Sequence, residues 1–183
     1  MKVGQMYSVI SMIFASNFNE PLTAQNYEKI KTSSDWIIQN ECENNKKGRK
    51  LYADFLQNES LAEIRTDFRS IKYLFNASYY FASAKDDLAK FYAQINFSPK
   101  LGESDSISNQ LLLIASILKN ELDESHAKLL KSFLISFFLP YAATLAIELS
   151  TSAKSSFYRS LGYFLSEYCD NLQEIFAIKR KAE

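Results

Sequence analysis

The chain has 183 residues, of which 47% are hydrophobic and 23% are charged. This composition suits one globular domain and argues against disorder. Its 21 basic residues balance 21 acidic residues, so the net charge is zero and no general nucleic-acid surface is indicated. The basic runs at residues 46–50 and 179–181 are interpreted as solvated surface.

Turn-forming residues are scarce, since the chain contains only four glycines and three prolines. A sheet protein needs more of them in its turns. Long stretches with apolar residues at helical spacing therefore predict a single all-α domain of about eight helices. Two cysteines do not make a disulfide framework, which fits a reducing compartment.

The first predicted helix covers residues 3–18, where polar residues interrupt the apolar positions. This pattern favours an amphipathic helix over a signal peptide. Pro21 follows its end, and Thr23 is a predicted N-cap of the next helix. A further helix is expected to begin at residues 33–35 and to run through 36–38. The polar run at residues 40–50, which contains Gly48, predicts a loop.

Ser60 and Glu63 have the spacing of a capping box, so a helix is expected from there to Ile71. The aromatic stretch at residues 73–81 fits neither the helical nor the strand period. The pattern returns to helical spacing from Leu88 to Ile95.

The polar connection at residues 96–104 is the predicted hinge between an N-terminal half, 1–95, and a C-terminal half, 105–183. Ser104 or Asp105 is expected to cap the helix that follows. A long helix is predicted from residue 123 to 149, with a kink near Pro140. Its apolar centre, residues 133–147, is too short to span a bilayer and predicts the buried core of a bundle. Residues 150–154 break the chain before a last helix at 157–175.

Residue types that carry catalysis are sparse. The single histidine, His126, lies at a predicted helix start, and two distant cysteines give no zinc spacing. Glycine-rich phosphate loops and a serine elbow are absent from the sequence. We therefore predict a binding protein with no catalytic residue, metal or cofactor, and not an enzyme.

The aromatic stretch is the main candidate for a binding surface, because tyrosine combines a rigid apolar body with a polar tip. These residues either fold over the core or line a groove. Carboxylates occur just after the stretch and again near residue 103. If the two segments are adjacent, they form a cleft for a peptide with apolar and arginine side chains. The candidate residues are Tyr73, Phe75, Tyr79, Tyr80, Ser83, Asp86, Glu103, Asp105 and Ser106.

Several segments resemble the TorD/DmsD/NarJ family of chaperones for redox-enzyme maturation. Residues 133–141, FLISFFLPY, are similar to its F-L-x-x-H-L-x-P-W segment, and residues 155–161 to its F-Y-x-x-L-A segment. Residues 101–107 lie where the family has P-x-D-H-I/L, and residues 67–83 resemble D/E-Y/F-x-x-L-F followed by P-Y-E-S. The chain departs from these motifs at Ser106, Gln110, Phe137, Tyr141 and the segment from Tyr80 to Ser83.

The resemblance implies a cytoplasmic helical protein that binds an apo-molybdoenzyme, such as a formate dehydrogenase or a DMSO-reductase-type subunit, or its twin-arginine signal peptide. It would hold this client until molybdopterin is inserted, before export, as a monomer or domain-swapped dimer. Carried over by position, Asp105 and Ser106 contact the client at the hinge, and Tyr79, Tyr80 and Ser83 line the same groove. The alternatives are a nucleotide-binding helical domain and a self-associating helical interaction protein without such a client.

Overall fold

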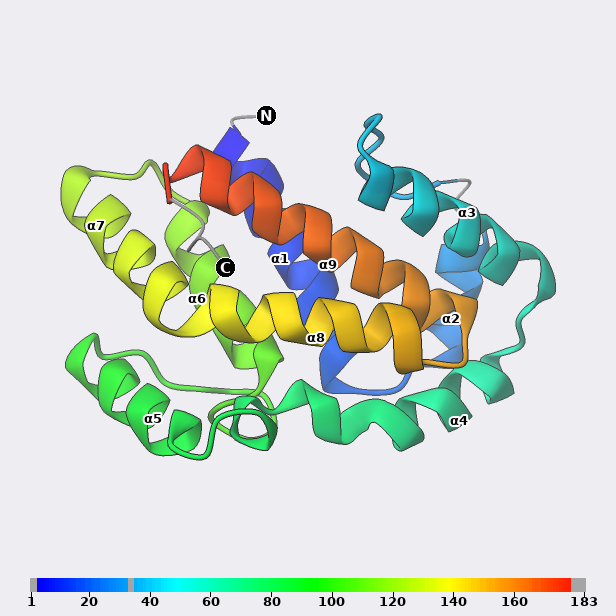
Figure 1. Ribbon diagram of the computed structural model, residues 1–183, viewed down its shortest axis with the longest axis horizontal. Coiled ribbons are helices and arrows are strands. Elements are labelled where there is room, and N and C mark those ends of the chain that lie inside the picture. The colour runs from blue at the N-terminus through cyan, green and yellow to red at the C-terminus, as the bar shows by residue number, and fades with distance from the viewer. Residues whose placement is uncertain (1–2, 33–34, 179–183) are drawn as a thin grey trace. The chain divides into compact units, whose positions relative to one another are not determined.

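A computed structural model describes residues 3–32 and 35–178, and the regular secondary structure in these ranges is helical (Figure 1). The α-helices are α1 (Val3–Asn19), α2 (Ala24–Lys31), α3 (Glu43–Asn58), α4 (Leu61–Ile71), α5 (Ala84–Gln94), α6 (Ile107–Leu118), α7 (Glu124–Phe133), α8 (Leu139–Ser152) and α9 (Ser156–Ile175). Because α7 continues into α8 without a break, the described residues form eight separate α-helical segments. The predicted all-α class is thus confirmed.

The chain divides into two compact units. The first unit combines the described part of Met1–Asn19 with Tyr73–Tyr141, and the second combines Glu20–Lys72 with Ala142–Glu183 as far as residue 178. In the first unit α1 packs along α6 (Figure 1). Phe14 of α1 and Ile107, Leu111 and Ile114 of α6 are fully buried. The predicted amphipathic first helix is therefore confirmed, and it packs on apolar residues of α6 at helical spacing.

In the second unit α3 packs along α9 (Figure 1). The prediction of a loop at residues 40–50 is wrong, because α3 begins at Glu43. A Cβ atom on Gly48 would lie 2.5 Å from the Phe164 ring, so glycine here permits close helix packing and does not mark a turn. Asn45 is fully buried and donates to the Glu167 carboxylate. These polar and small residues face a neighbouring helix, which a reading of local composition cannot detect.

The helix expected through residues 36–38 is also not formed, and the described part of this segment is irregular. Trp36 is buried and stacks on Phe164 with 4.3 Å between ring centroids and 3° between planes. This stacking lets an irregular segment bury its largest side chain without a helical face. The expected helix start at 33–34 and the basic residues 179–181 lie outside the described residues.

Two predicted helix starts are confirmed by their hydrogen bonds. Thr23 caps α2 by accepting from the N–H of Asn26. At α4, Ser60 accepts from the N–H of Glu63, and the Glu63 carboxylate accepts from the N–H of Ser60. At α6, however, the cap is Ser106 and not Ser104 or Asp105. The Asp105 side chain instead accepts a hydrogen bond from the N–H of Ser78.

Residues 96–104 lie inside the first compact unit, so the units do not coincide with the predicted halves. The fully buried Asn109 holds this connection: its Oδ1 accepts from the N–H groups of Lys100 and Leu101, and its Nδ2 donates to the carbonyls of Leu101 and Glu103. A hinge at residues 96–104 stays a prediction.

The long helix from Glu124 to Ser152 contains a π-helical turn, Leu134–Phe138, just before Pro140. Proline has no N–H, so the Ser136 carbonyl lacks its usual donor four residues on, and the wider turn accommodates this local change. Helix α8 extends to Ser152, three residues into the predicted break. Among the described residues, the helix from Glu124 to Ser152 is the one that is long and apolar enough to cross a bilayer. Half of its most apolar stretch is buried in the protein.

The buried Glu167 carboxyl predicts a pH-dependent stability. It accepts from the side-chain amides of Asn40 and Asn45, and burial raises its pKa above the ordinary value of 4.5. The folded state therefore keeps this proton at a pH where the unfolded state has lost it. The resulting contribution to stability is present below pH 4.5 and is lost as the pH rises through the folded pKa.

We expect Glu167→Gln, which cannot ionise, to lose less stability than the wild type when the pH rises from about 4.5 to 7. Urea denaturation midpoints at several pH values measure this difference. Glu174→Gln on the exposed side of the same helix is the matched control and keeps the wild-type pH dependence. Equal pH dependence in Glu167→Gln and the wild type would contradict the expectation.

Candidate functional site

The aromatic loop, residues 73–81, combines buried and exposed aromatic side chains. It consists of two 3₁₀ turns, Lys72–Phe75 and Ala77–Tyr79, in agreement with its lack of a regular period. Phe75 is buried, with its ring 5.1 Å from that of Phe18. In contrast, Tyr73, Tyr79 and Phe81 are 49%, 58% and 42% exposed. One part of the loop therefore covers the core, as the first alternative predicted, and the other part forms surface.

Asp105 ties this loop to the start of α6. Its Oδ2 accepts from the N–H of Ser78 at 2.7 Å, and its backbone carbonyl accepts from the N–H of Ala77 at 3.2 Å. An isolated antiparallel bridge between Asn76 and Ser106 adds to this junction. The aromatic loop and the segment near residue 103, whose adjacency the predicted cleft requires, are thus hydrogen-bonded to each other.

The surroundings of Asp105 are buried. Asp105 itself has no exposed surface, and its Oδ1 has no hydrogen-bond partner among the described residues. Burial raises the pKa of Tyr92 and of Tyr141, and the charge of Asp105 adds to both shifts. The Tyr141 hydroxyl donates to the carbonyl of Leu74 at 2.9 Å. This differs from the expectation that Asp105 and Ser106 meet the client directly, because both are buried and support the loop from beneath.

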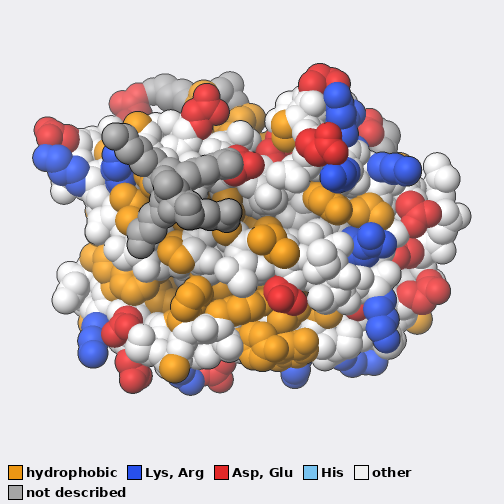
Figure 2. All heavy atoms as spheres, in the orientation of Figure 1, with side chains coloured by type: hydrophobic (Ala, Val, Ile, Leu, Met, Phe, Trp, Pro, Cys, Tyr) orange, Lys and Arg blue, Asp and Glu red, His pale blue; other side chains and the backbone are white. Residues whose placement is uncertain are grey.

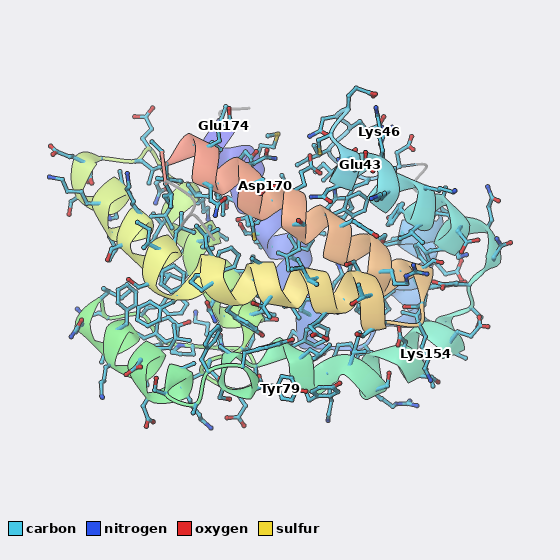
Figure 3. The ribbon with its side chains drawn as sticks, viewed as in Figure 1. Glu43, Lys46, Tyr79, Lys154, Asp170 and Glu174 are labelled. Atoms are coloured by element: carbon cyan, nitrogen blue, oxygen red, sulfur yellow. The ribbon has the colours of Figure 1, made fainter. Side chains whose placement is uncertain are left out.

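Aromatic rings form a continuous series from the exposed Tyr73 and Tyr79 through the half-buried Tyr80 to the buried Tyr141. The Tyr79 ring lies 4.8 Å from that of Tyr73 and 5.0 Å from that of Tyr80, and Tyr80 lies 5.6 Å from Tyr141. Figure 2 shows hydrophobic side chains on the viewed face in the region where Figure 3 labels Tyr79. Adjacent exposed aromatic rings are typical of surfaces that bind a partner.

A pocket of about 220 Å³, here named the aromatic pocket, lies beside this series. Its walls come from the aromatic loop, from the start of α5, and from the π-turn with the first residues of α8. The lining residues are Ala77, Phe81, Ser83, Ala84, Asp87, Leu88, Ser136, Phe137, Pro140 and Tyr141. It therefore joins two segments that carry the family resemblance, residues 67–83 and 133–141.

The predicted carboxylates occupy different places around this pocket. Glu103 is exposed and forms an ion pair with Lys85 at 2.6 Å, which raises the pKa of Lys85. Asp86 is exposed and does not line the pocket, whereas Asp87 does. Asp86 was the predicted site residue, so the structure shifts this role by one position to Asp87. The helical spacing could have identified Asp87. It directly precedes the buried Leu88 and lies four residues before Phe91, whose ring contacts the buried Phe133, so Asp87 is on the same side of α5 as Phe91.

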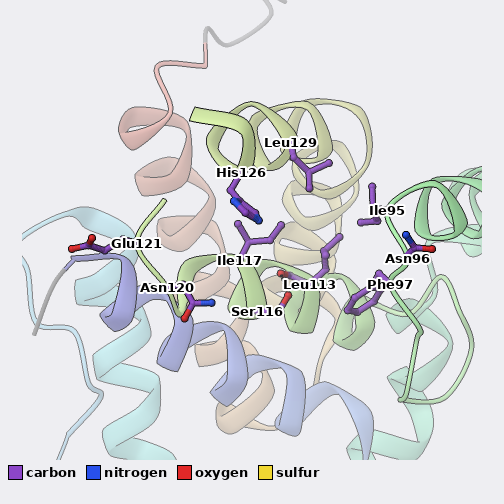
Figure 4. A pocket seen from close by; sticks show the side chains of 10 residues that line it. All are labelled: Ile95, Asn96, Phe97, Leu113, Ser116, Ile117, Asn120, Glu121, His126 and Leu129. Carbon is purple, nitrogen blue, oxygen red and sulfur yellow. Dashed lines mark hydrogen bonds between the residues drawn. The ribbon is translucent and has the colours of Figure 1, made fainter. Parts of the chain in front are cut away.

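A second pocket, of about 250 Å³, lies between the end of α5, α6 and the start of α7 (Figure 4). The His126 ring points into it toward Ile117, while Glu121 points away. His126 Nδ1 lies 2.9 Å from the Asp123 carboxylate, and Ser116 Oγ donates to the carbonyl of Leu113. The imidazole and the hydroxyl are thus engaged with different groups and do not form a nucleophile–base pair.

A third pocket, of about 440 Å³, lies in the second unit against α4. Asp67 and Glu59 contribute carboxylates to it, and Lys154, labelled in Figure 3, lies at its edge. Glu59 accepts from the N–H groups of Ser156 and Phe157, and Asp67 accepts from those of Lys154 and Ser155. Glu59 therefore satisfies N–H groups in the first turn of α9, whereas Asp67 holds the N-cap residue Ser155 and its predecessor Lys154.

No family model matches the chain, and neither a curated protein nor a solved structure matches it.

Proposed function

We propose that this protein is a cytoplasmic chaperone for the maturation of a molybdopterin-containing oxidoreductase. It binds the twin-arginine signal peptide or the apo form of this client and assists cofactor insertion before export. The observation that carries the proposal is the aromatic pocket beside the exposed rings of Tyr73 and Tyr79. Two of the segments that resemble the chaperone family line this pocket, and a third, around Asp105, holds its loop in place.

The chemistry of this surface supports a peptide ligand. The exposed aromatic rings bury apolar side chains, and carboxylates near them provide partners for basic residues. Tyrosine rings contribute contact area at a low cost in conformational entropy, which favours recognition of an extended segment. A molybdoenzyme signal peptide combines both elements, because basic residues precede an apolar stretch.

Titration calorimetry with the twin-arginine signal peptides of molybdoenzymes from the same genome tests the proposal. We expect a dissociation constant in the micromolar range, which corresponds to about −8 kcal/mol. Tyr79→Ala removes the most exposed ring of the series and is expected to weaken binding about tenfold, since a central aromatic contact contributes on the order of 1–2 kcal/mol. Ile147→Ala, which removes an equally exposed apolar side chain from α8, serves as the control.

Absence of binding to all of these peptides, together with failure to retain any molybdoenzyme in pull-downs, would contradict the proposal. Asp105→Ala is a less direct test, because the loss of a buried carboxylate displaces the aromatic loop itself.

The same exposed rings support a second candidate function, which is self-association without a signal-peptide client. In that case light scattering would show a mass that rises with concentration, and Tyr79→Ala would return the protein to a monomer. A constant monomer mass would contradict self-association.

A further inference from the structure

The aromatic pocket has a definite chemical character. Phe81, Phe137 and Tyr141 contribute aromatic rings, Leu88 contributes an aliphatic wall, and Asp87 contributes a carboxylate. None of the residues that line it is basic. Ser136 and Pro140 are also in its wall. The pocket therefore offers apolar walls together with one carboxylate.

We propose that the aromatic pocket takes one arginine side chain of the client, with Asp87 as its ion-pair partner. This inference rests on the proposed function, since it assigns a part of the client peptide to a part of the site. The methylene stem of arginine packs on the apolar walls, and the planar guanidinium stacks on an aromatic face. Its five donors suit the Asp87 carboxylate in a bidentate arrangement.

Arginine fits these walls better than lysine does. The ammonium group of lysine is a compact, strongly hydrated charge, so its transfer into an aromatic pocket costs more. It also cannot bind a carboxylate in a bidentate way or stack as a plane. A volume of about 220 Å³ accommodates one long side chain, so the second arginine of a twin-arginine pair lies outside the pocket.

Asp87 is available to an incoming cation. Its side chain is 47% exposed, and the Lys90 ammonium lies 4.0 Å away, at the limit of an ion pair. Exposed pairs of this kind contribute little to stability, so a guanidinium replaces Lys90 at small cost. Asp86 has the same charge but lies on a different face of α5 and does not line the pocket. The inference thus distinguishes two adjacent carboxylates.

The test is a titration of two matched variants with a twin-arginine signal peptide and with versions in which each arginine becomes lysine. We expect Asp87→Asn to weaken binding at least tenfold and to remove the preference for arginine over lysine at one of the two positions. Asp86→Asn removes an equal charge and is expected to bind within about twofold of the wild type. Circular dichroism and thermal melting establish that both variants fold.

Wild-type affinity of Asp87→Asn, or a loss of affinity in Asp86→Asn instead, would overturn the pocket assignment while leaving the chaperone proposal intact. If no signal peptide binds, Nα-acetyl-arginine amide serves as the probe in ¹H–¹⁵N spectra at millimolar concentration. Shifts of the Ala84, Asp87 and Leu88 N–H signals that disappear in Asp87→Asn would support the arginine pocket although the chaperone proposal fails. Absence of these shifts would overturn the pocket assignment as well.

Discussion

Asp67→Ala is expected to lower the free energy of unfolding by about 3–5 kcal/mol, because it leaves several buried donors without their acceptor. Asp67 is 4% exposed. Its Oδ2 accepts from the N–H of Ser155 at 2.8 Å and from the Ser155 hydroxyl at 2.6 Å. Both of its oxygens also accept from the N–H of Lys154. The carboxylate thereby offsets the positive end of the α9 dipole.

Urea denaturation measures the effect, and Asp67→Asn provides a graded comparison. Asparagine keeps one acceptor oxygen but replaces the other with a donor that faces N–H groups, so we expect a loss of roughly half that of alanine. Asp35→Ala, at an exposed position of the same unit, is the control and should change stability by less than about 0.5 kcal/mol. An Asp67→Ala protein as stable as this control would show that α9 does not depend on the Asp67 carboxylate.

This prediction also explains part of the family resemblance in physical terms. Asp67 and Ser155 belong to two of the similar segments, 67–83 and 155–161, and they are hydrogen-bonded to each other. These two residues join α4 to the start of α9. This structural role explains their presence without a bound ligand. Asp67→Asn is therefore expected to alter stability more than affinity for the proposed client.

Gly162→Ala is expected to destabilise the protein by about 2–3 kcal/mol, although alanine favours a helix interior by about 1 kcal/mol. A Cβ atom at this position of α9 would lie 2.7 Å from the backbone N of Ser150 and 2.9 Å from the carbonyl O of Ala146. Backbone atoms of α8 cannot rotate away as a side chain can. The overlap must therefore separate the two helices.

Thermal melting of Gly162→Ala beside Glu174→Ala measures the effect. Glu174 is exposed in the same helix, so its replacement reports helix propensity without the close approach. We expect Glu174→Ala to melt near the wild-type temperature and Gly162→Ala to melt clearly below it. An increase in melting temperature for Gly162→Ala would mean that α8 and α9 are not in close contact at this point in solution.

Local signals were sufficient where the partners are close in sequence. The capping box of Ser60 and Glu63, the Thr23 cap and the helical class depend on contacts within one or two turns. The periodic apolar residues from Ile107 to Leu118 also predicted their own burial. The failures at residues 36–50 have the opposite origin, since Trp36, Asn45 and Gly48 are matched to Phe164 and Glu167 more than a hundred residues away.

The candidate site likewise combines features that local sequence predicts with features that depend on residues distant in the chain. Composition and irregular period predicted a binding surface at the aromatic loop, and acidic residues nearby predicted a partner with basic side chains. The sequence could not show that Asp105 is buried under the loop or that Asp87, and not Asp86, lines the pocket. These features depend on how α5, the loop and the π-turn come together.

The sequence alone was sufficient to predict that the chain is helical, where most helices begin, and which aromatic segment departs from the helical pattern. These properties follow from backbone propensity, capping and the 3.6-residue period, which act over a few residues. Packing between distant parts of the chain sets the role of each carboxylate: some hold the start of a helix, some support the loop, and some stay accessible to solvent. Burial and the choice of hydrogen-bond partner set these roles, and both depend on residues that are distant in the chain.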